Sequence, residues 1–170
     1  MLTELSSQLT LSMNIQQAPS AANKYYEPHV ALLLKSYERL LHRPLVEVSN
    51  SSEVGQQIFC AEFALLSHDT QSDPIFNYAN KTALDLFELT WDDLIVMPSR
   101  HSAEAVLQQD RERSMAKVMK DGYIEDYSGV RISKNGKRFL MQGAVIWNVH
   151  DEQGNYRGQA ACFKDWTWIE

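Results

Sequence analysis

The chain has 170 residues, of which 44% are hydrophobic and 22% charged, and its formal net charge of −6 comes from 22 acidic and 16 basic residues. This length predicts one domain with a helical extension, and this composition excludes global disorder. The acidic balance argues against a protein dedicated to nucleic acid, which would need a net positive field around the phosphate backbone.

The cysteine pattern and the N-terminal sequence exclude further classes of protein. Cys60 and Cys162 are far apart and form no CxxC pair, which disfavours a disulfide framework or a zinc knot. No secretion signal precedes the first helix, and no stretch reaches the roughly 18 apolar residues of a membrane span. We therefore expect a cytoplasmic protein that does not associate with membranes.

Helices are predicted in the first part of the chain. Residues 1–24 are rich in Ser, Gln, Asn and Ala, which predicts a flexible leader. A helix is expected from Glu27 to about Arg43, because Pro28 suits its first position and apolar residues recur on one face. Ser51 or Ser52 is expected to cap a shorter helix through Gln57. Residues 25–62 would then form a helical extension, and residues 63–170 the core domain.

Short elements follow. Residues 63–67 predict a buried strand, with a continuing helix as the alternative, and residues 74–80 predict a second strand. A helix is expected over residues 80–88, and Thr90 with Asp93 resembles a capping box that starts another helix at Trp91. Ser102 is expected to cap a longer helix that runs to Asp121, where Gly122 ends it.

The last third predicts three strands, over residues 123–133, 137–149 and 156–168. Asn135-Gly136 is typical of a two-residue hairpin turn. In the middle strand, one face would carry Met141, Val145, Trp147 and Val149, and the other Leu140, Ala144 and Ile146. Because both faces are apolar, we expect both to be covered. The helices between residues 80 and 121 would cover one face, and the N-terminal helix or a second subunit the other.

Several segments resemble PAS domains. These are IFNYANKTALDLFELTWDDL, RISKNGKRF and VIWNVHDEQGNYRGQAACF. More narrowly, FALLSHDTQSDPIFNYANKTALDLFE, PSRHSAE and YSGVRISKNGKRF are similar to the MEKHLA family. This PAS-related domain is found alone in bacteria and at the C-terminal end of certain plant homeodomain-zipper transcription factors. The chain resembles the stand-alone bacterial type over residues 30–166.

This resemblance implies an α+β fold with an antiparallel sheet of about five strands. Short helices would cover one face, and the N-terminal helix would pack on the other. It also implies a sensory or interaction role, with no defined ligand. Fold alone does not decide function, so the candidate residues are considered separately.

The sequence gives little support for the cofactors that PAS domains are known to bind. Flavin photoreceptors of this fold use a cysteine in a Cys-Arg pair, whereas Ser99 and Arg100 stand at the comparable position, which excludes covalent flavin photochemistry. Haem-binding members present a histidine from the long helix, and residues 104–121 contain none, although His101 lies just before them. The cofactor therefore stays unassigned.

A ligand pocket is predicted between the sheet and the helices. With the expected hairpin register, the inward side chains would be Tyr127, Arg131, Gln142, Ala144, Ile146, Ala160 and Cys162. Arg131 is a forked donor suited to a carboxylate or phosphate, and Gln142 can both donate and accept. We expect these two residues to hold a small anionic ligand. Two alternatives stay open: the opposite parity would place Val130 and Ile132 inside, or Arg131 could pair with Asp126 or Glu125.

Metal binding and catalysis are disfavoured. His68, Asp69 and Asp73 cluster in sequence, but their spacing matches no metal-site template. Ser67 adjoins His68, yet neighbours on a strand point to opposite faces, so no nucleophile and base are paired. We therefore expect no enzymatic activity and no bound metal.

Three routes are considered for the signal output of such a module. The last predicted strand reaches the end of the sequence, so a signal is expected to leave through the N-terminal helix, the sheet surface or a bound protein. Trp166 and Trp168 would form an apolar patch, and we expect a homodimer through the sheet face and the N-terminal helix. The alternatives are an enzyme or carrier of the NTF2-like type, or a dimerisation module without a ligand.

Overall fold

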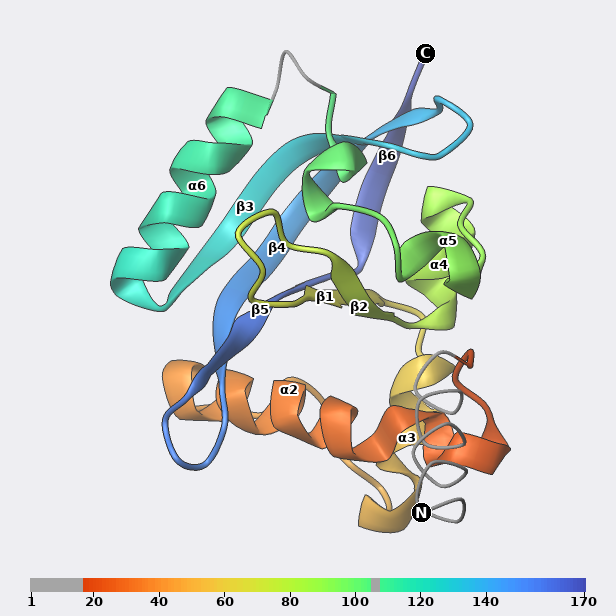
Figure 1. The fold of residues 1–170 in the computed structure, drawn as a ribbon, viewed down its shortest axis with the longest axis vertical. Helices are drawn as coiled ribbons and strands as arrows, with labels where there is room; N and C mark the ends of the chain where they lie inside the picture. Colours follow the sequence, from red (N-terminus) through yellow and green to blue (C-terminus); the bar gives the residue numbers. More distant parts are fainter. Residues whose placement is uncertain (1–16, 105–107) are drawn as a thin grey trace, which may run out of the picture.

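An antiparallel sheet forms the middle layer of the computed structural model (Figure 1). The structure describes residues 17–104 and 108–170, and of residues 108–111 it describes the backbone alone. Its strands are β1 (Ala64–His68), β2 (Phe76–Ala79), β3 (Tyr123–Ile132), β4 (Arg138–His150), β5 (Tyr156–Phe163) and β6 (Asp165–Ile169). Their order is β2-β1-β5-β4-β3, and β6 also pairs with β4. The predicted α+β class is confirmed, and β1 is a strand rather than a continuing helix.

The last predicted strand is divided in two. Residues 145–150 of β4 pair with β5, and residues 138–142 of β4 pair with β6. Both halves therefore lie along the same edge of β4, so that six strands occupy the five predicted positions of the sheet.

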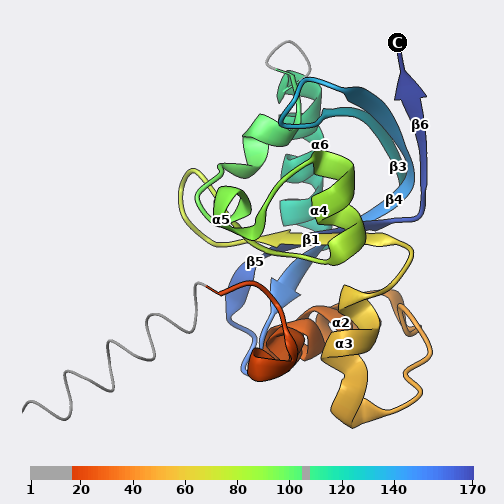
Figure 2. The same ribbon diagram turned by 90° about the vertical axis from the view of Figure 1, so that its right-hand side faces the viewer.

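Helices cover both faces of the sheet (Figure 2). On one face lie α4 (Lys81–Phe87), α5 (Trp91–Leu94), the 3-10 helix η3 (Ser99–Ser102) and α6 (Gln108–Asp121). On the other lie η1 (Ala21–Tyr26), α2 (Glu27–Leu41), η2 (Ser51–Glu53) and α3 (Val54–Phe59). The chain's own N-terminal helices thus cover the part of the second face around residues 147–150 of β4, as predicted for the N-terminal helix, and leave the part near residues 138–142 open.

Helix α2 is joined to β4 by packing and by polar contacts. The indole Nε1 of Trp147, which is fully buried, donates to the carbonyl of Leu33 at 3.3 Å. The hydroxyl of Ser36 donates to the carbonyl of Asn148 and accepts from the amide of His150, both at 3.0 Å. Because these partners are buried or half-buried, separating α2 from the sheet would leave polar groups unpaired, which costs about 1–3 kcal/mol each.

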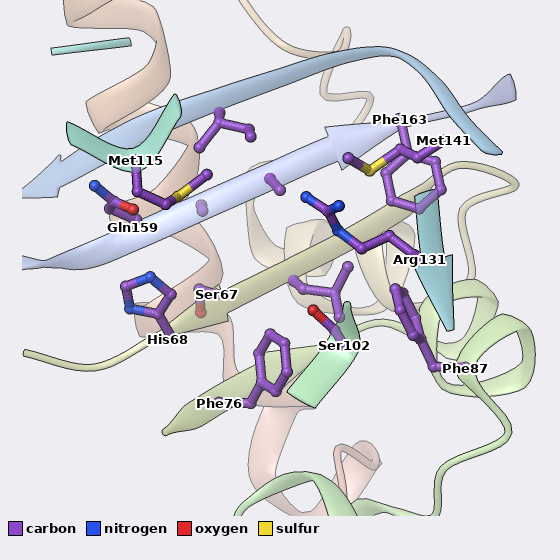
Figure 3. A pocket seen from close by; sticks show the side chains of 14 residues that line it. Ser67, His68, Phe76, Phe87, Ser102, Met115, Arg131, Met141, Gln159 and Phe163 are labelled. Carbon is purple, nitrogen blue, oxygen red and sulfur yellow. The ribbon is translucent and has the colours of Figure 1, made fainter. Parts of the chain in front are cut away.

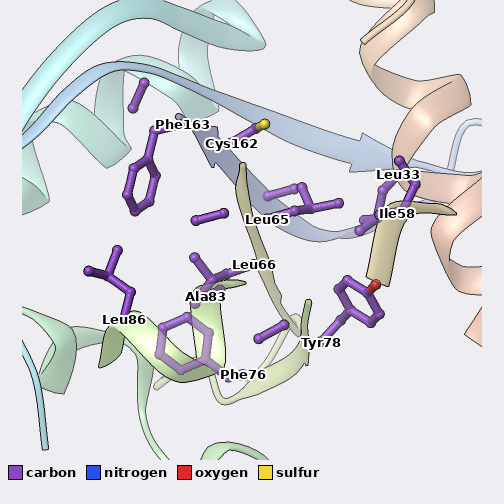
Figure 4. Close-up of a cluster of buried hydrophobic side chains, with 14 of the residues drawn as sticks. Leu33, Ile58, Leu65, Leu66, Phe76, Tyr78, Ala83, Leu86, Cys162 and Phe163 are labelled. Carbon is purple, nitrogen blue, oxygen red and sulfur yellow. The ribbon is translucent and has the colours of Figure 1, made fainter. Parts of the chain in front are cut away.

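Asn80 ties three elements together from a position with no exposed surface. Its Oδ1 accepts from the amides of Leu65 at 3.0 Å and Ala83 at 3.1 Å. Its Nδ2 donates to the carbonyls of Ile58 at 3.1 Å and Phe63 at 2.7 Å. One amide therefore joins the end of α3, the start of β1 and the start of α4. Figure 4 shows the buried side chains of Ile58, Leu65 and Ala83 from these three elements.

Some local expectations were wrong in detail. The cap of the second helical segment is Asn50, whose Oδ1 accepts from the amide of Ser52 at 3.1 Å. Ser102 closes η3, where its hydroxyl donates to the carbonyl of Ser99 at 2.7 Å. The predicted start of the long helix directly after Ser102 lies outside the described residues. The capping box of Thr90 and Asp93 is confirmed.

The β3–β4 turn also differs from the two-residue hairpin predicted for it. The amide of Gly136 donates to the carbonyl of Ser133, and the amide of Ser133 donates to the carbonyl of Lys137. Gly136 has φ +86°, whereas Asn135 is not left-handed. This is a three-residue loop with a single left-handed glycine.

A bulge in β4 changes the predicted alternation of its side chains. Gly129 pairs with Met141, and Tyr127 pairs with Ala144, so β4 has one residue more than β3 between the two pairs. Gly143 lies in this bulge with φ +61°, a backbone conformation that glycine adopts without steric strain. Met141 therefore shares the face of Ala144, whereas the strict alternation predicted them on opposite faces.

Asn80→Asp tests the buried amide with a nearly isosteric side chain. The second carboxylate oxygen would face the carbonyls of Ile58 and Phe63 without a proton to donate. We expect a loss of about 3–5 kcal/mol in the free energy of unfolding at pH 7. This environment raises the pKa of the new acid, so the loss should shrink as the pH falls and the acid becomes a donor.

Urea unfolding of Asn80→Asp and wild type at pH 7 and pH 5 measures this effect. Gln153→Glu, at an exposed position, serves as the matched amide-to-acid control and should change stability by less than about 0.5 kcal/mol. Equal stability of Asn80→Asp and the control would contradict the role assigned to Asn80.

Candidate ligand-binding cavity

A cavity of about 60 Å³ lies between the sheet and the helices on the α4–α6 side (Figure 3). Its large apolar side chains are Phe76, Phe87, Met115, Met141, Ile146 and Phe163, and its polar ones are His68, Ser102, Arg131 and Gln159. Ser67 also belongs to the lining, but its hydroxyl is directed to His29 of α2. Leu66, Ala160 and Ala161 complete the lining. A buried water needs about 10–15 Å³ by a comparable measure, so the cavity holds roughly four to six water-sized groups.

Arg131 is the charged group of this cavity. Its side chain leaves β3, is only 6% exposed, and directs the guanidinium into the cavity in Figure 3. Nη1 donates to the carbonyl of Val130 at 2.9 Å, and Nη2 donates to the hydroxyl of Tyr127 at 3.4 Å. The guanidinium carbon also lies 5.6 Å from the centre of the Tyr127 ring, a cation–π distance.

The alternatives left open for Arg131 are excluded by its surroundings. Val130 and Ile132 are half-buried on the opposite side of β3, so the predicted parity holds. The carboxylate of Glu125 pairs with Arg43. Among the side chains that the structure describes, no carboxylate forms an ion pair with Arg131.

Gly129 makes room for this arrangement. A Cβ at this position would lie 2.9 Å from the Tyr127 hydroxyl and 3.0 Å from Nη1 of Arg131. Such distances are too short for ordinary contact, so a larger residue would displace both groups. The sequence Tyr-Ser-Gly-Val-Arg thus positions the guanidinium through a residue that has no side chain.

The structure divides the predicted pocket residues into three groups. Arg131, Ile146 and Ala160 line the cavity. Tyr127 contacts Arg131 without reaching the cavity, and Ala144 is buried opposite Tyr127 in the strand register. Their role in binding stays a prediction.

Gln142 and Cys162 lie elsewhere. The Gly143 bulge turns Gln142 to the outer face, where its Oε1 accepts from the Thr167 hydroxyl at 2.9 Å. Cys162 points to the α2–α3 side of the sheet, beside Leu65 in Figure 4. Burial there raises the pKa of its thiol to about 12, so the thiol stays protonated and behaves as a small apolar group.

His68 and Gln159 are cavity residues that the sequence analysis did not assign to the pocket. They face each other in the register of β1 with β5. These strands are about ninety positions apart in the sequence, and no local pattern reports such a pairing. The close approach of β1 and β5 depends on Gly158, because a Cβ there would lie 1.9 Å from the carbonyl oxygen of His68.

A chain of polar groups connects the cavity wall to α2 across the sheet. Ser67, which is 3% exposed, donates its hydroxyl to Oδ1 of Asn77 at 2.6 Å. Nε2 of His29 lies 2.9 Å from the same hydroxyl. Since the serine proton is engaged by Asn77, the histidine acts as the donor in this pair. Burial lowers the pKa of His29 from 6.5 to about 4, which keeps the ring neutral at pH 7.

An open groove of about 300 Å³ adjoins the cavity. It shares His68, Met115 and Gln159 with the cavity lining. Its outer part includes the ion pair of Arg100 with Asp73, whose Nε–Oδ1 distance is 3.0 Å. The shared residues mark the boundary between the cavity and the solvent.

Neither metal ligands nor a membrane span were found in the described parts of the chain. Among the described side chains, those of residues 17–104 and 112–170, no three His, Cys, Asp or Glu gather as a metal site would require. Within the same ranges no helix is long and apolar enough to cross a bilayer. Asp69, one of the three residues considered for metal, instead caps a turn through the amides of Gln71 and Ile75.

Sequence comparison identifies relatives over most of the chain. The family model of the MEKHLA domain matches residues 27–168. The homeobox-leucine zipper protein HOX10 of Oryza sativa is 30% identical over 114 residues, which are 62% of this chain and 13% of that protein. ATHB-9 of Arabidopsis thaliana, also a homeobox-leucine zipper protein, is 25% identical over 104 residues, which are 59% of this chain and 12% of that protein. The chain therefore spans only a small part of these relatives.

Structure comparison finds PAS domains. A PAS domain from Colwellia psychrerythraea has a TM-score of 0.56 at 14% identity, over 67% of this chain and 92% of that chain. An RNA-binding light-oxygen-voltage receptor has a TM-score of 0.57 at 13% identity, over 70% of this chain and 34% of that chain. At such identities the likeness shows the fold alone, and it confirms the predicted PAS-like architecture.

A flavin does not fit the residues present. The cavity of about 60 Å³ is several times too small for a three-ring cofactor. At the position compared with the photoreceptor cysteine, Ser99 is buried, and its amide donates to the carbonyl of Pro74 at 2.8 Å.

The His29–Ser67 contact predicts a specific acid sensitivity. Unfolded His29 takes up a proton near pH 6.5, whereas folded His29 does so only near pH 4. Between these values the unfolded state binds more protons, so stability falls as the pH is lowered from 7 towards 4, by about 3 kcal/mol in total. His29→Gln keeps a donor near Ser67 without titrating, and its stability should depend less on pH.

Urea unfolding of both proteins at several pH values between 7 and 4.5 measures the difference in slope. His101→Gln, at an exposed position, should keep the wild-type slope. A wild-type slope in His29→Gln would contradict the assignment to His29.

Proposed function

Since the chain belongs to the MEKHLA domain family, we propose that it is a non-catalytic sensory and interaction module that binds a small anionic ligand beside Arg131. The PAS-like fold and the family support a sensory role. The cavity provides a site for the ligand, and the helices on both faces of the sheet provide surfaces for output.

The observation that carries the proposal is the buried charge of Arg131. A guanidinium keeps its proton in proteins, so it cannot neutralise itself when buried. Burial of an ion costs several kcal/mol unless an opposite charge or full hydrogen bonding offsets it. Among the described residues, Arg131 is offered the backbone carbonyl of Val130 and the hydroxyl and aromatic ring of Tyr127. An anion in the cavity would supply the opposite charge.

The buried polar groups do not favour catalysis. Ser67, His29 and Asn77 form a hydrogen-bonded row, but the hydroxyl of Ser67 is already committed to the Asn77 amide oxygen and faces α2 rather than the cavity. Ser102 is committed to a carbonyl of η3. His29 lies next to the Ser67 hydroxyl but acts as its donor, because the serine proton is engaged by Asn77. Neither hydroxyl is therefore activated by a base, and we propose no nucleophilic step.

The structure affects the rival interpretations differently. The PAS-like architecture removes the structural basis of the NTF2-like enzyme or carrier. A dimerisation module without a ligand keeps the same fold and differs only in whether the cavity is used. The stand-alone bacterial form of the family stays a prediction, because the relatives reported above are long plant proteins.

We also propose a homodimer through the open part of the sheet. Val130, Ile132, Leu140 and Ile169 are half-buried apolar side chains on the outer face of β3, β4 and β6. Helix α2 buries its apolar side on its own sheet, so it would border such an interface rather than form its centre. Trp168 is 50% exposed, but it pairs with Phe139 in the strand register and contacts its ring, which places it on the α4–α6 side of the sheet and outside this interface.

Native mass spectrometry tests the ligand. The purified protein should carry a non-covalent adduct that is absent from the denatured mass, and Arg131→Ala should lose most of it while remaining folded. Two results together would favour the ligand-free dimerisation module. They are a wild-type spectrum without an adduct, and an Arg131→Ala variant as thermally stable as wild type both in cell extract and in buffer.

Light scattering tests the dimer. At tens of micromolar we expect a mass of about twice the 19.5 kDa of the chain. Leu140→Lys should yield a monomer, because it places a charge in the apolar interface. Val96→Lys, at a position 71% exposed and away from the sheet, should leave the dimer intact. A monomeric wild type at this concentration would contradict the proposal.

A further inference from the structure

The cavity is elongated along β1 and β5. His68 pairs with Gln159 at one end of the two strands, and Ala64 pairs with Phe163 at the other. Phe163 lies four positions after Gln159, which corresponds to about 13 Å along an extended strand. Figure 3 shows His68, Gln159 and Met115 at one end of the cavity and Arg131, Phe87 and Phe163 at the other. The two ends therefore differ in chemistry.

The end at His68 is the entrance. His68, Met115 and Gln159 line both the cavity and the open groove between the β1–β2 loop and α6. The groove also contains Tyr156 and the Arg100–Asp73 pair, which are polar and reach solvent. A ligand that passes these three shared residues comes from water into a chamber with mostly apolar walls.

The opposite end is formed by buried residues and carries the charge, since Arg131, Phe87 and Phe163 are 6%, 3% and 2% exposed. Arg131 lies there among aromatic side chains, with the ring centres of Phe87 and Phe139 5.1 Å apart and those of Phe139 and Phe163 6.5 Å apart. Of its five N–H donors, two are used by the carbonyl of Val130 and the hydroxyl of Tyr127, which leaves three without a partner among the described residues and available to a ligand. A fork of parallel N–H groups matches a carboxylate in two-point geometry.

We propose that the ligand is a short, unbranched monocarboxylate of about four to six non-hydrogen atoms, which enters carboxylate first and pairs with Arg131. The size follows from the cavity volume of about 60 Å³. The single negative charge follows from the single cation among the described lining residues. The apolar tail follows from the methionine, isoleucine and phenylalanine walls. A phosphate would bring a second charge and no apolar part. This inference rests on the proposed function, because it specifies the ligand of the same site.

Ala161 is a second position at which a substitution can alter the cavity. It lines the middle of the cavity and pairs with Leu66 and Ile146 in the neighbouring strands. Ala161→Leu would fill the chamber without changing its charge. Arg131→Met has the complementary effect, because it keeps an unbranched apolar side chain and removes the cation.

Thermal unfolding with matched probes tests the inference. The probes are butyrate, the neutral butyramide of nearly the same shape, and the bulkier pivalate, each at constant ionic strength. Wild type should gain about 4 °C in Tm at ten times the dissociation constant of butyrate, and far less with butyramide or pivalate. Arg131→Met should lose the preference for butyrate over butyramide, and Ala161→Leu should respond to neither.

Each outcome decides between the two proposals. Equal shifts with butyrate and butyramide in wild type would overturn the carboxylate inference and leave a ligand-binding cavity in place. No shift with any probe, together with an Ala161→Leu variant more stable than wild type, would indicate an apolar core to be filled, and would overturn the proposed function as well. A larger shift with pivalate than with butyrate would overturn the unbranched shape. The wild-type comparison of butyrate with butyramide stands even if Arg131→Met fails to fold.

Discussion

The buried amide of Asn80 is the contact on which the arrangement of the other elements depends. It uses both hydrogens of its Nδ2 and two acceptor sites of its Oδ1 on four backbone groups from three segments. Few side chains can do this, because the position requires two donors and an acceptor in one plane with no charge. The amide sets where β1 begins relative to α3 and α4. It therefore also fixes the position of Leu66 and His68 along the cavity wall.

Strand β1 then links the two sides of the molecule. Its alternate residues face the cavity and the N-terminal helices, so Ser67 bonds His29 of α2 while Leu66 and His68 line the cavity. A change in cavity occupancy and a change in the position of α2 would act on the same five-residue strand. This is a short physical route between a ligand site and an outer helix, and it needs no segment beyond the sheet itself.

Arg131 shows how a destabilising group can be retained in a core. Its charge is held by a carbonyl, a phenol and an aromatic face, and Gly129 leaves the space that these contacts need. An apolar residue of similar size would pack at lower cost. The arrangement is therefore better suited to recognition than to stability, since a buried cation discriminates strongly between an anion and a neutral molecule of the same shape.

The sequence by itself determined the elements whose signals are local. The apolar periodicity of α2, the Thr90–Asp93 capping box and the stop at Gly122 depend on residues within one or two turns, and all three are present. The inward side of Arg131 was expected from the predicted hairpin register, but the opposite parity stayed open, and only the observed register of β3 with β4 decided between them. Only the tertiary structure decided the rest of the site. The bulge at Gly143 moved Gln142 outward, and the pairing of β1 with β5 brought in His68 and Gln159. The physical reason is that a bulge or a distant strand pairing depends on the fit of whole surfaces, and local sequence does not encode that fit.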